Sequence, residues 1–200
     1  MNDHAMREAA IVNTALDLAE ERGVVGVTTA ALARRLHFTE AALYRYFPGK
    51  GAIIAAALRN LAERLFATML LELMPEAISQ GQTVPPQLQR HLRRFGLRKG
   101  LLLELVLYAS ATRDVALQAA GGEFLQEYGQ RMTAYFERLH ELHLTNSPAP
   151  AEELSRLWVC QVLGGFMHCR LTSEAWDPVE QPGFQAFTAR LQGAGSLAPS

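Results

Sequence analysis

Proline spacing constrains this chain more than any other feature of its sequence. The nine prolines leave four proline-free intervals longer than 25 residues, 1–47, 49–74, 87–147 and 151–177. Because proline breaks the interior of a helix, only intervals of this kind can hold long helices. The intervals are rich in Ala, Leu, Glu, Gln and Arg, which favour helix, and strand signals are almost missing. The sequence therefore predicts an all-α protein.

The composition is that of a folded globular protein. Hydrophobic residues make up 49% of the 200 positions and charged residues 20%, which excludes intrinsic disorder. A chain of this length buries about 70% of its unfolded surface, so it needs no metal or disulfide to stay folded. The most apolar stretch, 101–111, is interrupted by Glu104 and is too short to cross a bilayer. Residues 1–4 lack the pattern of an export signal, so we expect a cytoplasmic protein.

Apolar periodicity and capping residues predict the positions of the helices. The first helix is predicted over 4–22, with Gly23 as a left-handed cap behind it. Two short helices follow, each preceded by a threonine that can cap it, Thr28 and Thr39. A long helix is predicted to begin after Pro48. Further helices are predicted at about 87–95, 98–111, 114–142, 151–172 and 183–193.

The segment 28–47 has the proportions of a helix-turn-helix motif. Its predicted turn contains His37. On the second short helix, Leu43 is expected to point inward. Between residues 26 and 50 there are four basic residues and one acidic residue, which gives this stretch a charge of +3 in a chain of net charge −1. The residues expected on the outer side of the second helix, which can contact bases and phosphates in a major groove, are Glu40, Ala41, Tyr44 and Arg45.

The run 26–58, centred on FTEAALYRYFPGKGAI, resembles the DNA-binding domain of the TetR family of bacterial transcriptional regulators. The most specific part is LYRYFPGK at 43–50. In the family this segment combines the recognition helix, a proline that ends it, here Pro48, and a lysine that contacts phosphate, here Lys50. The resemblance implies a DNA-binding domain over 1–50 and a helical ligand-binding and dimerisation domain over 51–200. It also implies a homodimer that binds a palindromic double-stranded DNA operator and acts as a repressor released by a small-molecule effector.

The resemblance also implies which residues contact DNA. Two features depart from the family pattern: Ala42 replaces a common threonine, and Glu40 puts a negative charge on the reading face, where it can accept a hydrogen bond from cytosine. His37 stands at a turn position where the resemblance implies a left-handed backbone and where glycine is usual. The operator sequence therefore stays open. The DNA contacts implied by the match are Thr28, Thr29, Thr39, Glu40, Ala41, Ala42, Tyr44, Arg45 and Lys50.

A ligand site and a dimer interface are expected in the C-terminal part. Gly164 and Gly165 in mid-helix suggest close approach of another helix, although the terminal helix could instead pack only against its own chain. The candidate ligand contacts are Phe66, Met69, Tyr108, Tyr128, Trp158, Gln161 and His168. The candidate dimer contacts are Trp158, Val162, Gly165, Cys169, Phe184, Phe187 and Leu191.

Other functions find less support in the sequence. No nucleophile elbow, Walker loop or metal-binding histidine pair is present, so we expect neither an enzyme nor a cofactor. Cys160 and Cys169 lie on opposite faces of one predicted helix and lack a CxxC pattern, so no metal site is expected there. A basic cluster, interpreted as a solvated face or as a site for an anion or an acidic partner, comprises Arg90, Arg93, Arg94, Arg98 and Lys99.

Two alternatives to a ligand-controlled repressor remain open. The EAALYR sequence at 40–45 also resembles a nucleoid-occlusion branch of the family, which binds DNA without a known inducer. A protein of that type would use the same DNA-binding head in an architectural or cell-division role. A helical binding module without a DNA role is the other alternative.

Overall fold

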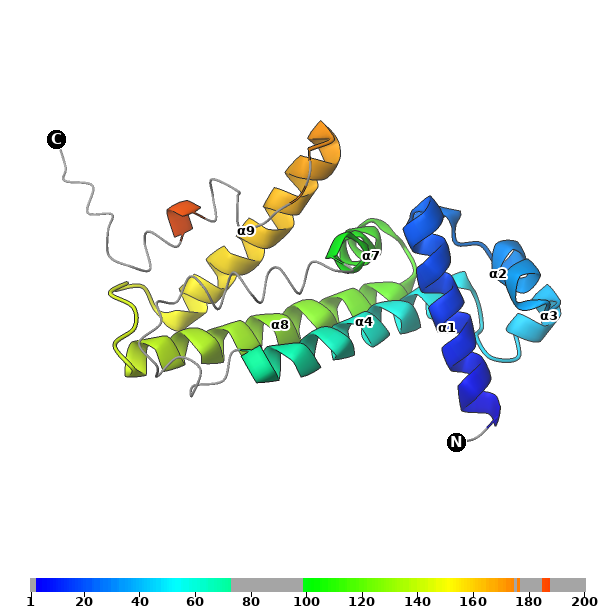
Figure 1. Ribbon diagram of the computed structural model, residues 1–200, viewed down its shortest axis with the longest axis horizontal. Helices are drawn as coiled ribbons and strands as arrows, with labels where there is room; N and C mark the ends of the chain where they lie inside the picture. The colour runs from blue at the N-terminus through cyan, green and yellow to red at the C-terminus, as the bar shows by residue number, and fades with distance from the viewer. Residues whose placement is uncertain (1–2, 73–98, 175, 177–184, 188–200) are drawn as a thin grey trace. The chain divides into compact units, whose positions relative to one another are not determined.

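The computed structural model describes residues 3–72, 99–174, 176 and 185–187, and it leaves out the side chains of 68–72 and of Lys99 (Figure 1). All regular elements within these ranges are helical, as the sequence predicts, and no described helix has the length and apolar character needed to span a bilayer. The predicted helix at 87–95 and most of that at 183–193 lie outside the described residues. The helices are α1 (Asp3–Arg22), η1 (Val24–Gly26), α2 (Thr29–Leu36), α3 (Glu40–Leu43), α4 (Lys50–Glu72), α7 (Lys99–Ala111), α8 (Val115–Glu141) and α9 (Ala151–Thr172).

The chain divides into two compact units, each built from two stretches of sequence. The first comprises 1–64 and 98–125, and the second 65–97 and 126–200. Both α4 and α8 contribute residues to each unit. The first unit thus adds α7 and parts of α4 and α8 to the predicted DNA-binding segment, and the functional boundary predicted at residue 50 stays a prediction.

The first unit has an apolar core around α1. This helix contacts η1, α2 and α7, and the apolar stripe expected from its sequence is buried. Gly23 ends α1 with φ 71° and ψ 164°, a conformation that is nearly restricted to glycine but is not the left-handed cap expected there. Fully buried side chains of this unit include Ile11, Leu16, Leu18, Leu32, Leu43, Ile53, Ile54 and Leu58.

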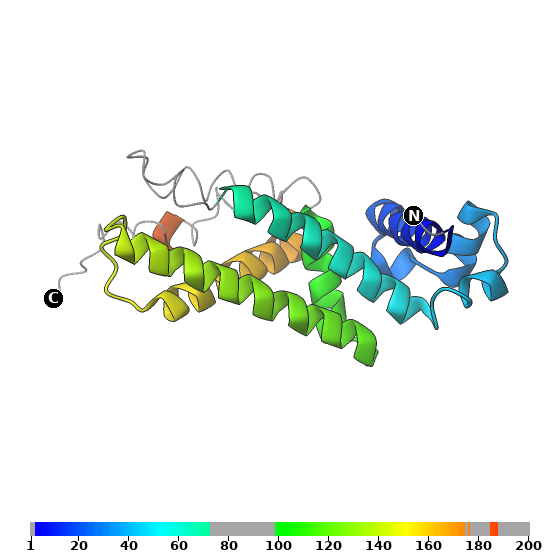
Figure 2. The same cartoon turned by 90° about the horizontal axis from the view of Figure 1, so that it is seen from below.

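Within the first unit, α4 and α8 lie side by side and run in the same direction (Figures 1 and 2). At Gly51, near the start of α4, an added Cβ would overlap the carboxylate of Asp114, the residue before α8. Asp114 also caps α8, since its Oδ1 accepts a hydrogen bond from the N–H of Leu117 at 3.0 Å. Further along, Arg59 Nε and Glu123 Oε2 are 2.9 Å apart. A glycine at position 51 therefore allows the two helices to approach this closely.

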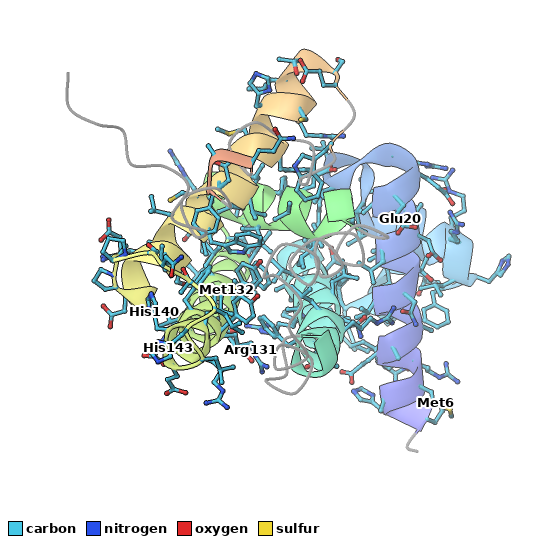
Figure 3. All side chains as sticks on the ribbon, turned by 60° about the vertical axis from the view of Figure 1, so that its left-hand side comes forward. Met6, Glu20, Arg131, Met132, His140 and His143 are labelled. Atoms are coloured by element: carbon cyan, nitrogen blue, oxygen red, sulfur yellow. The ribbon has the colours of Figure 1, made fainter. Side chains whose placement is uncertain are left out.

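In the second unit, α9 crosses the last part of α8 at an oblique angle (Figures 1 and 2). The Trp158 indole donates to the Tyr128 hydroxyl at 2.8 Å, and the Ser155 hydroxyl donates to the Gly129 carbonyl at 2.8 Å. Met132, labelled on α8 in Figure 3, is completely buried. These contacts fix which face of α9 lies against its own chain.

The C-terminal end of α8 is closed by a left-handed residue. His143 has φ 54°, and its N–H donates to the His140 carbonyl at 3.0 Å. The N–H of the next residue, Leu144, donates to the Leu139 carbonyl at 2.9 Å. Both histidines therefore lie at the helix end (Figure 3), where a positive side chain is favourable.

Candidate nucleic-acid interface

The turn between α2 and α3 has the geometry that the sequence predicts. His37 adopts φ 56° and ψ 37°, and the N–H of Phe38 donates to the Ala33 carbonyl at 2.8 Å. Thr28 and Thr39 cap the two helices by accepting hydrogen bonds from the N–H groups three residues on, each at 3.1 Å. Because both ends of the turn are fixed by hydrogen bonds, α3 is held in one orientation against α2.

The exposed side of α3 carries the residues predicted to meet DNA. Leu43 is buried, whereas Glu40, Ala41 and Arg45 are exposed and Ala42 is half-buried. The phenol of Tyr44 is also exposed, at 53% of its full surface. This face therefore offers small side chains, a phenol and a guanidinium to a partner.

Thr29 and Glu40, both predicted DNA contacts, bind each other. The Thr29 hydroxyl donates to Glu40 Oε2 at 2.6 Å, linking the first residue of α2 to the first residue of α3. The bond fixes the position of the Glu40 carboxylate on the exposed face. A fixed acceptor can discriminate between bases better than a mobile one, because less rotamer freedom is lost on binding.

Lys50 lies at the start of α4, where the resemblance expects a phosphate contact. Its ammonium group is 3.4 Å from the Val25 carbonyl and 5.7 Å from the centre of the Tyr108 ring. Tyr108 was predicted to contact a ligand, but in the structure it forms a cation–π contact with Lys50 within the first unit. Each lysine N–H can bind a separate acceptor, so these contacts leave donors for a phosphate.

The arginines of α2 differ in their surroundings. Arg35 Nη1 lies 2.7 Å from Glu21 Oε2, and this hydrogen bond lowers the pKa of the Glu21 carboxyl. Arg34 and Arg45 are exposed and make no hydrogen bond or ion pair with another described residue. Within the segment 28–50, the positive charge available to a partner therefore comes mainly from Arg34, Arg45 and Lys50.

The residues predicted to bind a ligand differ in their surroundings within the described structure. Tyr128 and Trp158 are buried and hydrogen-bonded to each other, and burial raises the pKa of the Tyr128 hydroxyl. Phe66 is also buried, 4.6 Å from the Arg131 guanidinium. Gln161 is half-buried and His168 is exposed, while the side chain of Met69 lies outside the described residues.

The structure buries most of the predicted dimer contacts within their own chain. Trp158, Val162 and Cys169 are only 0%, 5% and 1% exposed. Phe187 is buried as well, with its ring 5.6 Å from Trp158. Gly165 is half-buried, and Phe184 and Leu191 lie outside the described residues. This face of α9 forms the core of the second unit, because Trp158 binds Tyr128 there.

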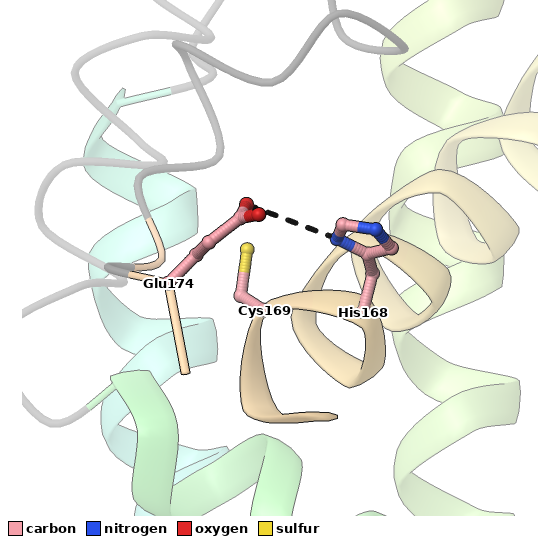
Figure 4. Close-up of side chains that lie close together, drawn as sticks. All are labelled: His168, Cys169 and Glu174. Carbon is pink, nitrogen blue, oxygen red and sulfur yellow. Dashed lines mark ion pairs between the residues drawn. The ribbon is translucent and has the colours of Figure 1, made fainter. Parts of the chain in front are cut away.

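A cluster that the sequence did not predict lies at the end of α9. The metal-binding atoms of His168, Cys169 and Glu174 all lie within 4.8 Å of one another (Figure 4). The neighbouring His and Cys in the sequence were a signal for it. The approach of Glu174 depends on a chain reversal after the helix, which spacing alone does not predict.

Residues 11–57 match the sequence model described as bacterial regulatory proteins of the tetR family. The nucleoid occlusion factor SlmA of Mannheimia succiniciproducens is 31% identical over 129 residues, which cover 64% of this chain and 54% of that protein. The chain thus spans about half the length of the curated relatives that it matches.

Solved structures share the whole fold at low sequence identity. A TetR-family regulator of Cytophaga hutchinsonii superposes with a TM-score of 0.75 over 96% of both chains at 14% identity. SmeT, the repressor of a multidrug efflux pump of Stenotrophomonas maltophilia, superposes with a TM-score of 0.67 over 94% of this chain and 89% of its own, at 19% identity. At this level of identity the likeness concerns the fold alone.

Proposed function

We propose that this chain, which belongs to the TetR family of bacterial regulatory proteins, binds a specific operator DNA as a homodimer and represses transcription until a small molecule releases it. The observation that carries this proposal is the exposed face of α3, held in place by the Thr28 and Thr39 caps and the left-handed His37. The DNA contacts proposed on and around this face are Thr28, Thr29, Thr39, Glu40, Ala41, Ala42, Tyr44, Arg45 and Lys50.

In this mechanism α3 enters the major groove, because its small residues allow close approach to the base edges. Arg45 and Glu40 read bases, since a guanidinium can donate to guanine and a carboxylate can accept from cytosine. Tyr44 and Lys50 bind phosphates and set the register of the helix on the duplex. Because the position of the Glu40 carboxylate is fixed, the preferred operator depends on where its cytosines lie.

The second copy is proposed to bind on the face of α9 opposite the buried one. Leu157, Met167 and Leu171 are 41%, 49% and 80% exposed. Together with Cys160 and Gly164 they recur at alternating steps of three and four residues, the spacing of a helix-packing seam. The small residues in the middle permit a close crossing. A dimer is needed because two DNA-binding segments make twice as many of the contacts that select an operator.

The proposed effector binds within the second unit. Burial raises the pKa of the Tyr135 hydroxyl, and its oxygen has no hydrogen-bond partner among the described residues. A buried hydroxyl without a partner costs stability, so a ligand that supplies one is favoured. By linkage, a ligand that releases DNA must bind more weakly when operator is present.

A second candidate function is supported by the SlmA relatives. One of them, a nucleoid occlusion factor, matches over 64% of this chain, a span longer than the DNA-binding motif. A protein of that type would use the same α3 face without a small-molecule effector.

Mapping bound sites across the genome of the source organism distinguishes these functions. A ligand-controlled repressor is expected to occupy one or a few promoters and to leave them when its effector is present. A nucleoid-occlusion type protein is expected to occupy many dispersed sites. Arg45→Ala serves as the control variant and should lose the same sites. Absence of any enriched site for the wild-type chain would overturn both functions.

A further inference from the structure

We propose that His168, Cys169 and Glu174 form a binding site for a divalent transition-metal ion with the preferences of Zn²⁺. The three residues offer a nitrogen, a sulfur and an oxygen ligand, all within 4.8 Å of one another (Figure 4). Imidazole, thiolate and carboxylate are the three side-chain ligands of zinc in proteins. Nothing in the DNA-binding role requires these residues to meet.

The local backbone brings the three ligands together. The helix α9 ends at Thr172, and Ser173 takes the left-handed conformation with φ 60°. The N–H of Glu174 then donates to the Cys169 carbonyl at 3.1 Å. This turn points the chain back toward the helix, so that Glu174 Oε2 lies 3.9 Å from His168 Nδ1.

The geometry needs little adjustment to hold a metal ion. Bonds of about 2.0–2.3 Å to a tetrahedral zinc ion separate its ligand atoms by roughly 3.5 Å. His168 and Glu174 can make this adjustment, because their side chains are 61% and 58% exposed. Cys169 is 1% exposed and therefore supplies the fixed ligand. A water molecule can occupy the fourth position.

The electrostatic surroundings favour a cation. The last carbonyls of α9, a helix of 22 residues, place the negative end of its dipole at this cluster. The ion pair between His168 and Glu174 is exposed and contributes little stability alone. Binding converts the Cys169 thiol to a thiolate and releases its proton to solvent, so metal affinity falls as the pH is lowered.

Cobalt(II) gives a direct test on the full-length chain, because thiolate ligation produces a charge-transfer band. The wild-type chain, titrated with Co²⁺ alone, is expected to develop this band at one ion per chain, and added Zn²⁺ is expected to remove it. His168→Asn and Glu174→Gln should each weaken Co²⁺ binding at least about tenfold. Both residues are exposed, so these variants should fold normally. Cys169→Ser should abolish the band.

Cys160→Ser is the matched control, because Cys160 is exposed on the same helix and outside the cluster. It should keep the band and the wild-type affinity. The proposal fails if the wild-type chain gives no band at one equivalent, or if Cys160→Ser removes it. It also fails if His168→Asn and Glu174→Gln bind Co²⁺ as tightly as the wild type, because Cys169 would then bind without its partners. DNA binding is not a readout here, so either result leaves the proposed function to be tested separately.

Discussion

At the scale of single residues, the contact between Lys50 and Tyr108 links the DNA-binding segment to α7. The Lys50 ammonium lies over the Tyr108 ring at 5.7 Å and near the Val25 carbonyl at 3.4 Å. We infer that the ring and the carbonyl hold the charge at the start of α4, where a phosphate can reach it. Tyr108 then acts as a positioning residue for Lys50.

Replacing Tyr108 should distinguish the effect of holding Lys50 in position from the effect of its positive charge. Tyr108→Leu removes a contact worth about 0.5–1 kcal/mol, so binding to all DNA sequences should weaken about two- to fivefold with an unchanged salt slope. Lys50→Ala should weaken binding and also reduce the salt slope by about 0.9, because one phosphate contact is lost. Fluorescence anisotropy at several salt concentrations measures both quantities. Tyr108→Phe, the control, should behave as wild type. If Tyr108→Leu bound DNA as tightly as the wild type, Tyr108 would not position Lys50.

Among the helices and turns, features that depend on neighbouring residues were easier to predict from the sequence than packing between distant segments. The threonine caps and the left-handed turn depend on neighbouring residues, and the sequence predicted them correctly. The packing face of α9 was harder, because Trp158 and Val162 on one side are as apolar as Met167 and Leu171 on the other. The buried side is the one that packs against its own chain, where Trp158 donates a hydrogen bond to Tyr128, 30 residues away. No pattern within α9 contains that information.

The approach of α4 to α8 gives a prediction on stability. Gly51→Ala should lower the free energy of unfolding by about 1–3 kcal/mol, the usual cost of overpacking, because the new methyl group overlaps the Asp114 carboxylate. Gly49→Ala is the control, since a Cβ there meets nothing within 4 Å, and it should change stability by less than about 0.5 kcal/mol. Denaturant unfolding measures both. If the two variants were equally stable, the close approach would be refuted.

At the scale of the whole molecule, DNA recognition is expected to require two copies of the chain. The exposed apolar seam of α9 contains Leu157, Met167 and Leu171. Phe187→Glu is a poor test of the interface, because the Phe187 ring packs against Trp158 and Phe136 in its own chain. A charge there should unfold the second unit and not simply separate two copies.

A charge on the seam should separate the copies without unfolding them. Met167→Glu is expected to give a folded monomer that binds operator DNA at least about tenfold more weakly, because a buried unpaired carboxylate disfavours the dimer. Thr172→Glu adds the same charge at an exposed position off the seam and should stay dimeric. Sedimentation and circular dichroism measure mass and fold. A folded, fully dimeric Met167→Glu variant would place the interface elsewhere.

Recognition of a particular DNA sequence by α3 can be measured directly. Selection of bound fragments from random DNA identifies the preferred sequence. Its Kd can then be compared with that of a scrambled duplex at one stated salt concentration near 0.15 M. We expect a two-fold symmetric site bound at least about 10³-fold more tightly than the scrambled duplex, the ratio typical of specific DNA-binding proteins. Equal affinity for both duplexes would contradict it.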